Sequence, residues 1–177
     1  EKQIDKNSRV LLGGDIELSS KNKAISSDFL KKLKDSFIVT EVVEFTSIIR
    51  TNKDKSQTTR FKAVDDLYPL IGEIKVFPSD SLKILKTEPD SILIDETTKN
   101  NLDLKLGDKI KIQDISFKII GIIESLPDIS GFFLLGDLAL INTSSLEGLK
   151  INNLGTFLNF KYKMVRKDYS VKRLSNF

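Results

Sequence analysis

The sequence contains no histidine, cysteine or tryptophan and only one methionine. Without histidine and cysteine it cannot build a Ser-His or Cys-His nucleophile, a Cys/His zinc site, the usual haem ligation or a dithiol redox motif. Only 9 Gly and 4 Pro occur among 177 residues, and 40% of the residues are hydrophobic. This composition excludes a disordered or low-complexity chain. We therefore expect a folded protein that is not an enzyme, with no catalytic, cofactor-binding or metal-binding residues.

Long apolar runs and a strong charge of one sign are also absent. No stretch approaches the roughly 20 apolar residues that span a bilayer, and no signal peptide opens the chain. The start at Glu1 without a Met predicts a segment of a longer protein. The net charge of +3 is too small to indicate a nucleic-acid binder. Residues 151–177 carry six basic residues and one acidic residue, a stretch that we interpret as a solvated terminal face.

The first third of the chain predicts a helix packed on a small mixed sheet. A strand is expected over residues 9–19, with a bend at Gly13-Gly14. Apolar residues at helical spacing predict a short amphipathic helix over residues 27–36, capped by the serines at its start. Residues 37–50 and 60–65 are rich in β-formers and are separated by a polar hairpin loop.

A second pattern begins near residue 75, where we place a lobe boundary. Residues 92–94 form an expected buried strand, and Asp95 caps an expected helix that runs to residue 102. The alternation in residues 109–112 and 117–123 predicts a β-hairpin. Strands over 138–141 and 156–164, a helical turn over 144–148 and a last helix from Asp168 follow. The residues expected to be buried are Leu30, Leu33, Val64, Ile110, Ile112, Phe117, Ile119 and Ile122.

Three short motifs have a plain structural interpretation. Gly13-Gly14-Asp15 lacks the rest of a phosphate-binding loop pattern and predicts a strand bend. Asp65-Asp66 and Asp95-Glu96 could hold a metal or a proton. Neighbouring side chains on a strand point in different directions, so we expect a turn and a helix cap instead.

The segment from Pro127 to Phe133 is the best candidate for contact with a partner or a substrate. Pro127 and Gly131 interrupt regular structure, while Ile129, Phe132 and Phe133 offer more apolar area than a solvated loop needs. The alternative is that the two phenylalanines begin a core strand.

Four stretches, taken in order and spacing, resemble a known family. They are residues 8–17, residues 62–65 with 68–72, residues 104–112, and residues 117–123 ahead of Pro127-Asp128. Together they resemble the periplasmic core domain of MacB/FtsX-like ABC transporter permeases, most closely the subgroup linked to lysophospholipase biosynthesis. The resemblance covers residues 8–165. It departs at Gly136-Asp137, where Gly-Pro is expected.

The resemblance implies an α+β fold of two lobes. Residues 1–75 and 136–177 would form a porter-like α/β lobe, truncated at its C-terminus, and residues 76–135 an inserted, small, β-rich Sabre-like lobe. It implies a non-catalytic domain on the periplasmic side of the bacterial inner membrane, without cofactors, that couples cytoplasmic ATP hydrolysis to transport or mechanotransmission. The implied partners are a cytoplasmic ATPase subunit, a second permease copy in a homodimer, and a periplasmic substrate or accessory protein, but no nucleic acid.

Two other classes of function stay open at this point. The hairpin around residues 104–112 is similar to those of small barrels, which indicates a soluble ligand-binding or nucleic-acid-binding module as an alternative. A carboxylate-dependent or metal-dependent enzyme is the third hypothesis.

Overall fold

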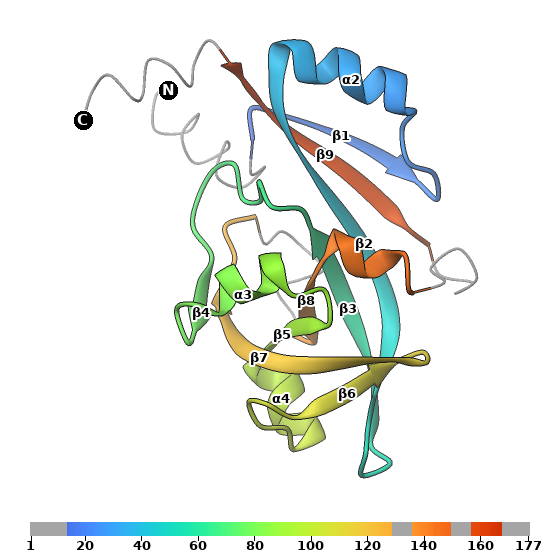
Figure 1. Ribbon diagram of the computed structural model, residues 1–177, viewed down its shortest axis with the longest axis vertical. Helices are drawn as coiled ribbons and strands as arrows, with labels where there is room; N and C mark the ends of the chain where they lie inside the picture. The colour runs from blue at the N-terminus through green and yellow to red at the C-terminus, as the bar shows by residue number, and fades with distance from the viewer. Residues whose placement is uncertain (1–13, 129–135, 150–156, 168–177) are drawn as a thin grey trace.

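The computed structural model describes residues 14–128, 136–149 and 157–167, which form one mixed sheet flanked by helices (Figure 1). Of the strand expected over residues 9–19, residues 9–13 lie outside these residues, as does the expected helix from Asp168. Within the described parts, no helix has the length and apolar character needed to cross a membrane. In chain order the elements are β1 (Ile16–Lys21), α2 (Ser27–Ser36), β2 (Phe37–Thr51), β3 (Ser56–Val64), β4 (Lys75–Phe77), α3 (Ser81–Thr87), β5 (Ser91–Asp95), α4 (Glu96–Leu102), β6 (Lys109–Ile112), β7 (Ile115–Ser125), β8 (Leu138–Asn142), the 3₁₀ turn η2 (Thr143–Leu146) and β9 (Asn159–Arg166).

Six of the strands close into a barrel. β2 pairs with β3, β3 with β8, β8 with β5, β5 with β7, β7 with β6, and β6 returns to β2. The β3–β8 and β5–β7 pairs are parallel and the others are antiparallel. Outside this ring, β9 and then β1 extend the sheet from the first half of β2, and β4 adds to β7. The predicted hairpin is confirmed as the β6–β7 pair.

The 15-residue strand β2 belongs to both regions of the sheet. Its residues Phe37–Glu44 pair with β9, Val42–Arg50 pair with β3, and Ile49–Thr51 pair with β6. In Figure 1 it runs from the end covered by α2 down into the barrel. Successive side chains of a strand point to opposite faces, so β2 has two distinct sides. Val43, Phe45 and Ile49 face the barrel interior, whereas Val42 and Glu44 lie on the outer side.

The barrel interior holds the largest apolar cluster of the described residues. Within it, the rings of Phe45 and Phe61 stack with their centroids 5.1 Å apart. α4 contributes Leu102 to this cluster and begins at Asp95, whose carboxylate accepts a hydrogen bond from the Thr98 amide at 2.9 Å. The predicted cap is therefore confirmed. The buried cluster comprises Val43, Phe45, Ile49, Phe61, Ala63, Ile92, Ile94, Leu102, Leu104, Ile110, Ile112, Phe117, Ile119, Ile122, Ala139, Ile141, Leu149 and Leu158.

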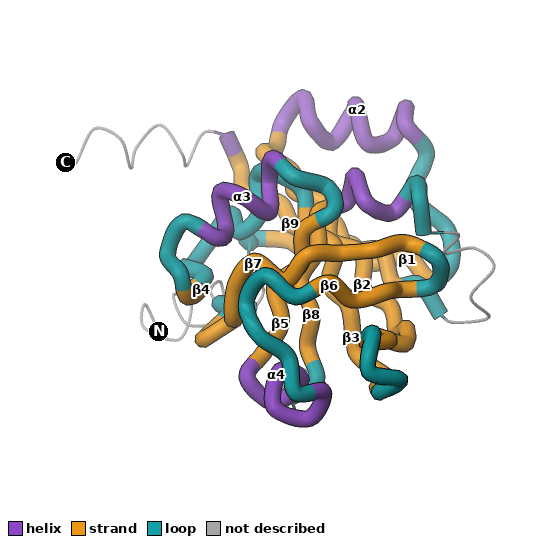
Figure 2. Tube along the Cα trace, turned by 60° about the horizontal axis from the view of Figure 1, so that its bottom comes forward, coloured by secondary structure: helices purple, strands orange, loops and turns teal. Residues whose placement is uncertain are grey.

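α2 covers the sheet at the opposite end of the molecule from α4 (Figure 2). The helix spans the predicted residues and is capped by Ser26, which accepts a hydrogen bond from the Phe29 amide. At its other end the Lys167 ammonium donates to the carbonyls of Lys34 and Asp35, at 2.6 and 3.3 Å. A cation at a helix C-terminus satisfies free carbonyls and complements the helix dipole. The end of β9 is therefore fastened to α2.

The prediction that Leu30 and Leu33 are buried is wrong in degree, because both are only half-buried. They pack in a small cluster around Val39, Tyr162 and Met164. This cluster lies between one helix and the part of the sheet outside the barrel, so it cannot enclose a side chain fully. The other residues expected in the core are buried.

β4 and α3 were not predicted. α3 packs against the outer side of the barrel, where Leu85 joins a second apolar cluster with Leu93 and Leu140. The Ser81 hydroxyl donates to the Ile120 carbonyl at 2.9 Å. A Cβ at Gly121 would lie 2.5 Å from the Ser81 Oγ, so a glycine is needed for the helix to approach β7 this closely.

The predicted mixture of helices and strands is confirmed as a mixed α/β fold with a large sheet. Strands from before and after residue 75 share the barrel and its interior cluster. The division into two lobes stays a prediction.

Because Phe117 is 1% exposed in the barrel and Leu33 is half-buried, the two positions should differ in sensitivity. We expect Phe117→Ala to lower the free energy of unfolding by about 3–5 kcal/mol and Leu33→Ala by less than about 2 kcal/mol. Urea denaturation followed by circular dichroism measures both. Equal costs at the two positions would contradict the burial described above.

Candidate functional site

A group of charged side chains lies on the outer side of the sheet, where the barrel meets β9 and β1. Cross-strand register places Glu44 of β2 opposite Lys62 of β3, and Glu17 of β1 opposite Lys163 of β9. Lys161 is two residues before Lys163 and therefore shares its face. The alternation of these strands thus points five charged groups to the side of the sheet opposite α2.

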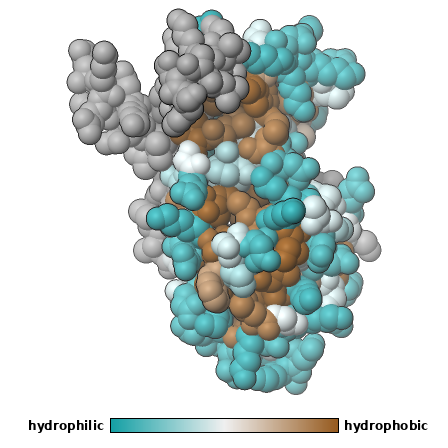
Figure 3. Space-filling view, turned by 60° about the vertical axis from the view of Figure 1, so that its left-hand side comes forward, coloured by the Kyte–Doolittle hydropathy of each residue, from teal (hydrophilic) through white to brown (hydrophobic). Residues whose placement is uncertain are grey.

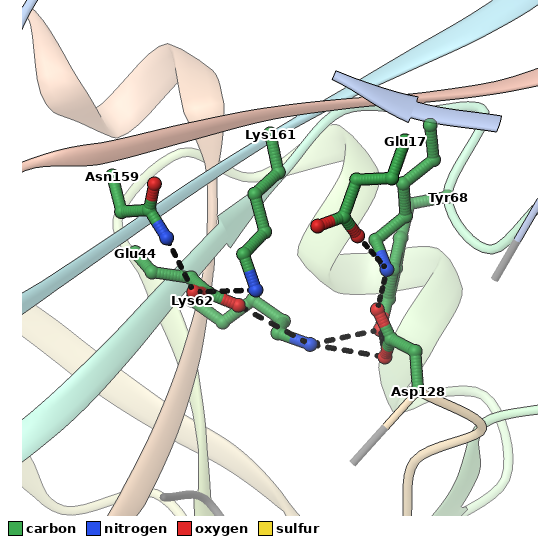
Figure 4. Close-up of polar contacts among 8 residues, drawn as sticks. Glu17, Glu44, Lys62, Tyr68, Asp128, Asn159 and Lys161 are labelled. Carbon is green, nitrogen blue, oxygen red and sulfur yellow. Dashed lines mark hydrogen bonds and ion pairs between the residues drawn. The ribbon is translucent and has the colours of Figure 1, made fainter. Parts of the chain in front are cut away.

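Asp128 enters this group from the segment that follows β7 and lies between two lysines (Figure 4). One of its carboxylate oxygens is 2.9 Å from the Lys62 ammonium, and the other is 2.6 Å from the Lys163 ammonium. The Tyr68 hydroxyl donates a hydrogen bond to the first oxygen. The side chains of Asp128, Lys62 and Lys163 are only 1%, 1% and 3% exposed. We call these four residues the Asp128 cluster.

A second layer of charge surrounds the Asp128 cluster. Glu17 is 3.2 Å from the Lys163 ammonium. Glu44 is 3.0 Å from the Lys161 ammonium and 3.9 Å from that of Lys62. The group therefore contains three carboxylates and three ammonium groups, so its net charge is zero. A buried charge is costly unless it is paired, and here every charge has a partner of opposite sign.

The environment shifts the ionisation of this group. Burial alone would raise the pKa of Asp128, but Lys62 and Lys163 outweigh it and lower the pKa to about 2. Burial lowers the pKa of Lys62, and the adjacent Asp128 carboxylate opposes this effect. Burial and then the charge of Asp128 raise the pKa of Tyr68, which stays a neutral hydrogen-bond donor. The Asp128 carboxylate is therefore ionised at neutral pH.

The arrangement of Asp128 and its partners is better suited to linking parts of the chain than to catalysis. The Asp128 carboxylate is enclosed by Lys62, Lys163 and Tyr68, and its lowered pKa makes it a poor acceptor for a substrate proton. Among the described residues, no cluster of acidic side chains could hold a metal ion. The Asp128 cluster links the segment after β7 to β3 and β9, three parts of the chain that are distant in sequence.

The structure brings together residues from separate stretches of the family resemblance. Lys62, Tyr68 and Asp128 meet in the Asp128 cluster. Nearby, a Cβ at Gly72, which has a φ of 89°, would lie 2.3 Å from the Pro127 Cβ, so these two stretches also touch. Asp65 does not contact this site and accepts hydrogen bonds from the Glu41 and Leu67 amides, which confirms its turn role.

The predicted contact residues Ile129, Phe132 and Phe133 lie outside the described residues, and their role stays a prediction.

The interpretation of residues 151–177 as a solvated face is wrong for Lys161 and Lys163. These two side chains pair with carboxylates where the barrel meets β9 and β1. Their alternation with Phe160, Tyr162 and Met164 signalled that one face of this strand is charged, but not that this face is enclosed. The partner carboxylates come from elsewhere in the chain, so the sequence did not reveal them.

Apolar side chains also reach the surface. Figure 3 shows two hydrophobic areas separated by a paler band on the side turned to the viewer. Large hydrophobic residues on the surface include Leu67, at 52% exposure, and Phe77 of β4, at 60%. Such exposure is compatible with contact to other proteins.

The fold and this site define a domain built on a mixed sheet and stabilised by internal ion pairs, and comparison with known proteins identifies the family. The sequence model of the MacB-like periplasmic core domain matches residues 2–166. The chain belongs to the MacB-like periplasmic core domain family, a family of ABC transporter permease domains. The comparisons do not test the predicted subgroup.

Relatives agree with this assignment. The chain is 27% identical over 165 residues to the uncharacterized ABC transporter permease YbbP of Escherichia coli K12, covering 92% of the chain and 20% of that protein. The chain thus spans about one fifth of its relative. The fold is similar to the periplasmic region of MacB from Actinobacillus actinomycetemcomitans, with a TM-score of 0.54, 14% identity, and 97% and 86% of the two chains covered. It is also similar to the extracellular domain of the noncanonic ABC-type transporter YknZ from Gram-positive bacteria, with a TM-score of 0.55, 9% identity, and 82% and 74% covered. The alternative of a ligand-binding or nucleic-acid-binding module is not favoured.

Removing the charge of Asp128 should destabilise the protein strongly. Asp128→Asn leaves two buried ammonium groups facing a neutral side chain, and we expect the free energy of unfolding to fall by about 3–5 kcal/mol. Urea denaturation at pH 7 measures the loss. Asp114→Asn, at an exposed position in the β6–β7 turn, is the matched control and should change stability by less than about 0.5 kcal/mol. Similar effects of the two variants would show that the Asp128 ion pairs contribute nothing.

The contribution of Asp128 should also depend on pH. Its pKa is about 2 when folded, against an ordinary value of 3.8, so its stabilisation is complete above about pH 4 and is lost as the pH falls towards 2. We expect the stability difference between wild type and Asp128→Asn to shrink by about 1.5 kcal/mol between pH 5 and pH 2.5. Urea titrations of both proteins at these pH values provide the test. A constant or growing difference would contradict a lowered pKa.

Proposed function

We propose that this chain is the non-catalytic periplasmic domain of an ABC transporter permease that carries movement from cytoplasmic ATP hydrolysis to the periplasm. In this proposal, a cytoplasmic ATPase subunit drives the permease and two permease copies work as a homodimer. The domain acts on a periplasmic substrate or an accessory protein, at the outer side of the bacterial inner membrane.

The observation that carries the proposal is the path of β2. This strand pairs with β9 at the α2 end of the molecule and with β6 in the barrel, so one continuous backbone connects the two regions. The described chain enters β1 and leaves β9 at the same end, because Ile16 is opposite Met164 and Phe37 is opposite Arg166. A displacement applied at that end would reach the barrel through β2 and through the Asp128 cluster.

The predicted division into a porter-like lobe of residues 1–75 and 136–177 and a Sabre-like lobe of residues 76–135 is part of the proposal. The β2–β6 and β5–β8 pairs, the shared barrel interior and the Asp128 cluster would then connect the lobes. The segment with Ile129, Phe132 and Phe133 directly follows Asp128 in sequence, so we retain it as the proposed contact with a substrate or an accessory protein.

The test uses the full-length permease with its ATPase subunit and a spin label at Lys105→Cys, an exposed position between α4 and β6 at the end of the barrel. We expect the distance between labels on the two copies to differ between the nucleotide-free state and the state with trapped ATP, measured by double electron–electron resonance. The permease without its ATPase subunit is the control and should show no effect of nucleotide. An unchanged distance in a complex that hydrolyses ATP would contradict the proposal.

A further inference from the structure

The region covered by α2 and the barrel share little apolar packing. The cluster under α2 contains Val39, Tyr162 and Met164, whereas the barrel interior has its own members. Among the described residues, the two clusters have only the partly buried Phe160 in common. Apolar burial is the main source of cohesion in a folded protein, so these two regions are joined more weakly than each is held internally.

Ion pairs supply a specific connection between the two regions. Asp128 belongs to the segment after barrel strand β7, and Lys163 belongs to β9, outside the barrel. The two side chains are 2.6 Å apart and almost completely buried. The other bonds of Asp128, to Lys62 and Tyr68, stay on the barrel side. Lys163 also pairs with Glu17 on β1, a strand that pairs only with β9 among the described strands.

Because both residues have other partners, the Asp128–Lys163 ion pair can separate without leaving an unpaired buried charge. After separation, Asp128 would keep Lys62 and Tyr68, and Lys163 would keep Glu17. Glu44 would keep Lys161 or Lys62. An isolated buried charge costs several kcal/mol, and this arrangement avoids that cost on both sides of the break. The charge group therefore divides into three neutral pairs, which are Asp128 with Lys62, Lys163 with Glu17, and Glu44 with Lys161.

We propose that the Asp128–Lys163 pair is a releasable tie, which holds the β1–β9 strand pair against the barrel and opens so that this pair turns about β2. The hinge lies in Val42–Glu44, the residues of β2 that pair with both β9 and β3. The tie lies on the outer side of the sheet, opposite α2, so its opening leaves the cluster under α2 in place. The role of this motion in a permease rests on the proposed function, but the tie itself is a property of the 177-residue chain.

Amide hydrogen exchange on this chain tests the tie. In the wild type, we expect the amides of β9 opposite the hinge, in residues 159–161, to exchange through a partial opening at low urea concentration, while those of β6 and β7 exchange only on global unfolding. β9 lies between β1 and β2 and is not an edge strand, so fraying at a sheet edge does not explain such an opening. Exchange of all these amides solely through global unfolding would overturn the proposal.

Substitutions locate the tie. Lys163→Met removes the pair from the β9 side, and we expect exchange in β9 to accelerate at least tenfold and still to proceed through the partial opening. Exchange in β6 and β7 should accelerate as well, because global unfolding also breaks the pair. Lys163→Arg, which keeps the charge, should restore slow exchange. Lys53→Met removes an exposed ion pair with Asp103, at 3.0 Å, and serves as the control without effect in β9. No acceleration in β9, or an acceleration there by Lys53→Met as well, would overturn the proposal. The wild-type measurement decides the matter if Lys163→Met does not fold. None of these exchange results would change the distance expected between the spin labels in the full permease. Each of the two proposals can therefore fail without the other.

Discussion

The carboxylate of Asp128 between two buried ammonium groups is the interaction that holds the parts of this domain in their relative positions. Apolar burial accounts for the barrel and for the cluster under α2, but each of these is complete within its own region. Asp128 contacts Lys62 on β3 and Lys163 on β9, so it bridges the two regions from the segment after β7. Glu44 adds a second bridge, because it pairs with Lys161 of β9 and with Lys62 of β3. The whole group, Asp128 included, contains three carboxylates and three ammonium groups and is neutral. This neutrality lowers the free-energy cost of burying a charge as deeply as that of Asp128.

This design would suit the transmission of movement that we propose for the domain. A purely apolar junction of good complementarity would be stable but would resist repacking, because well-packed interiors are not continuously deformable. A junction of ion pairs has few contacts, strict geometry and partners that can be exchanged. The continuous strand β2 keeps the two regions connected whether the pairs are closed or open. The chain belongs to the MacB-like periplasmic core domain family, and its relatives include ABC transporter permeases. This membership is consistent with the proposed mechanical role.

Local structure was largely predictable from the sequence, because short-range rules decide it. The Ser26 and Asp95 caps, the helix over residues 27–36 and the β6–β7 hairpin follow from spacing and residue type. Ring closure through β2–β6 and β3–β8 was not predictable, because pairing of distant strands leaves no mark in a single sequence. The Asp128 cluster was missed for the same reason. Its members Lys62, Tyr68 and Asp128 were each noted within the family resemblance, yet only the fold shows that they meet.

The most direct test of this account is the coupling energy between Lys163 and Asp128 in a double-mutant cycle. The cycle compares Lys163→Met, Asp128→Asn and the double variant by urea denaturation at pH 7, and it isolates the interaction of the two side chains from the other effects of each substitution. If the pair joins the two regions, the cost of the double variant should be at least about 2 kcal/mol smaller than the sum of the single costs. Costs that add to within about 0.5 kcal/mol would contradict it.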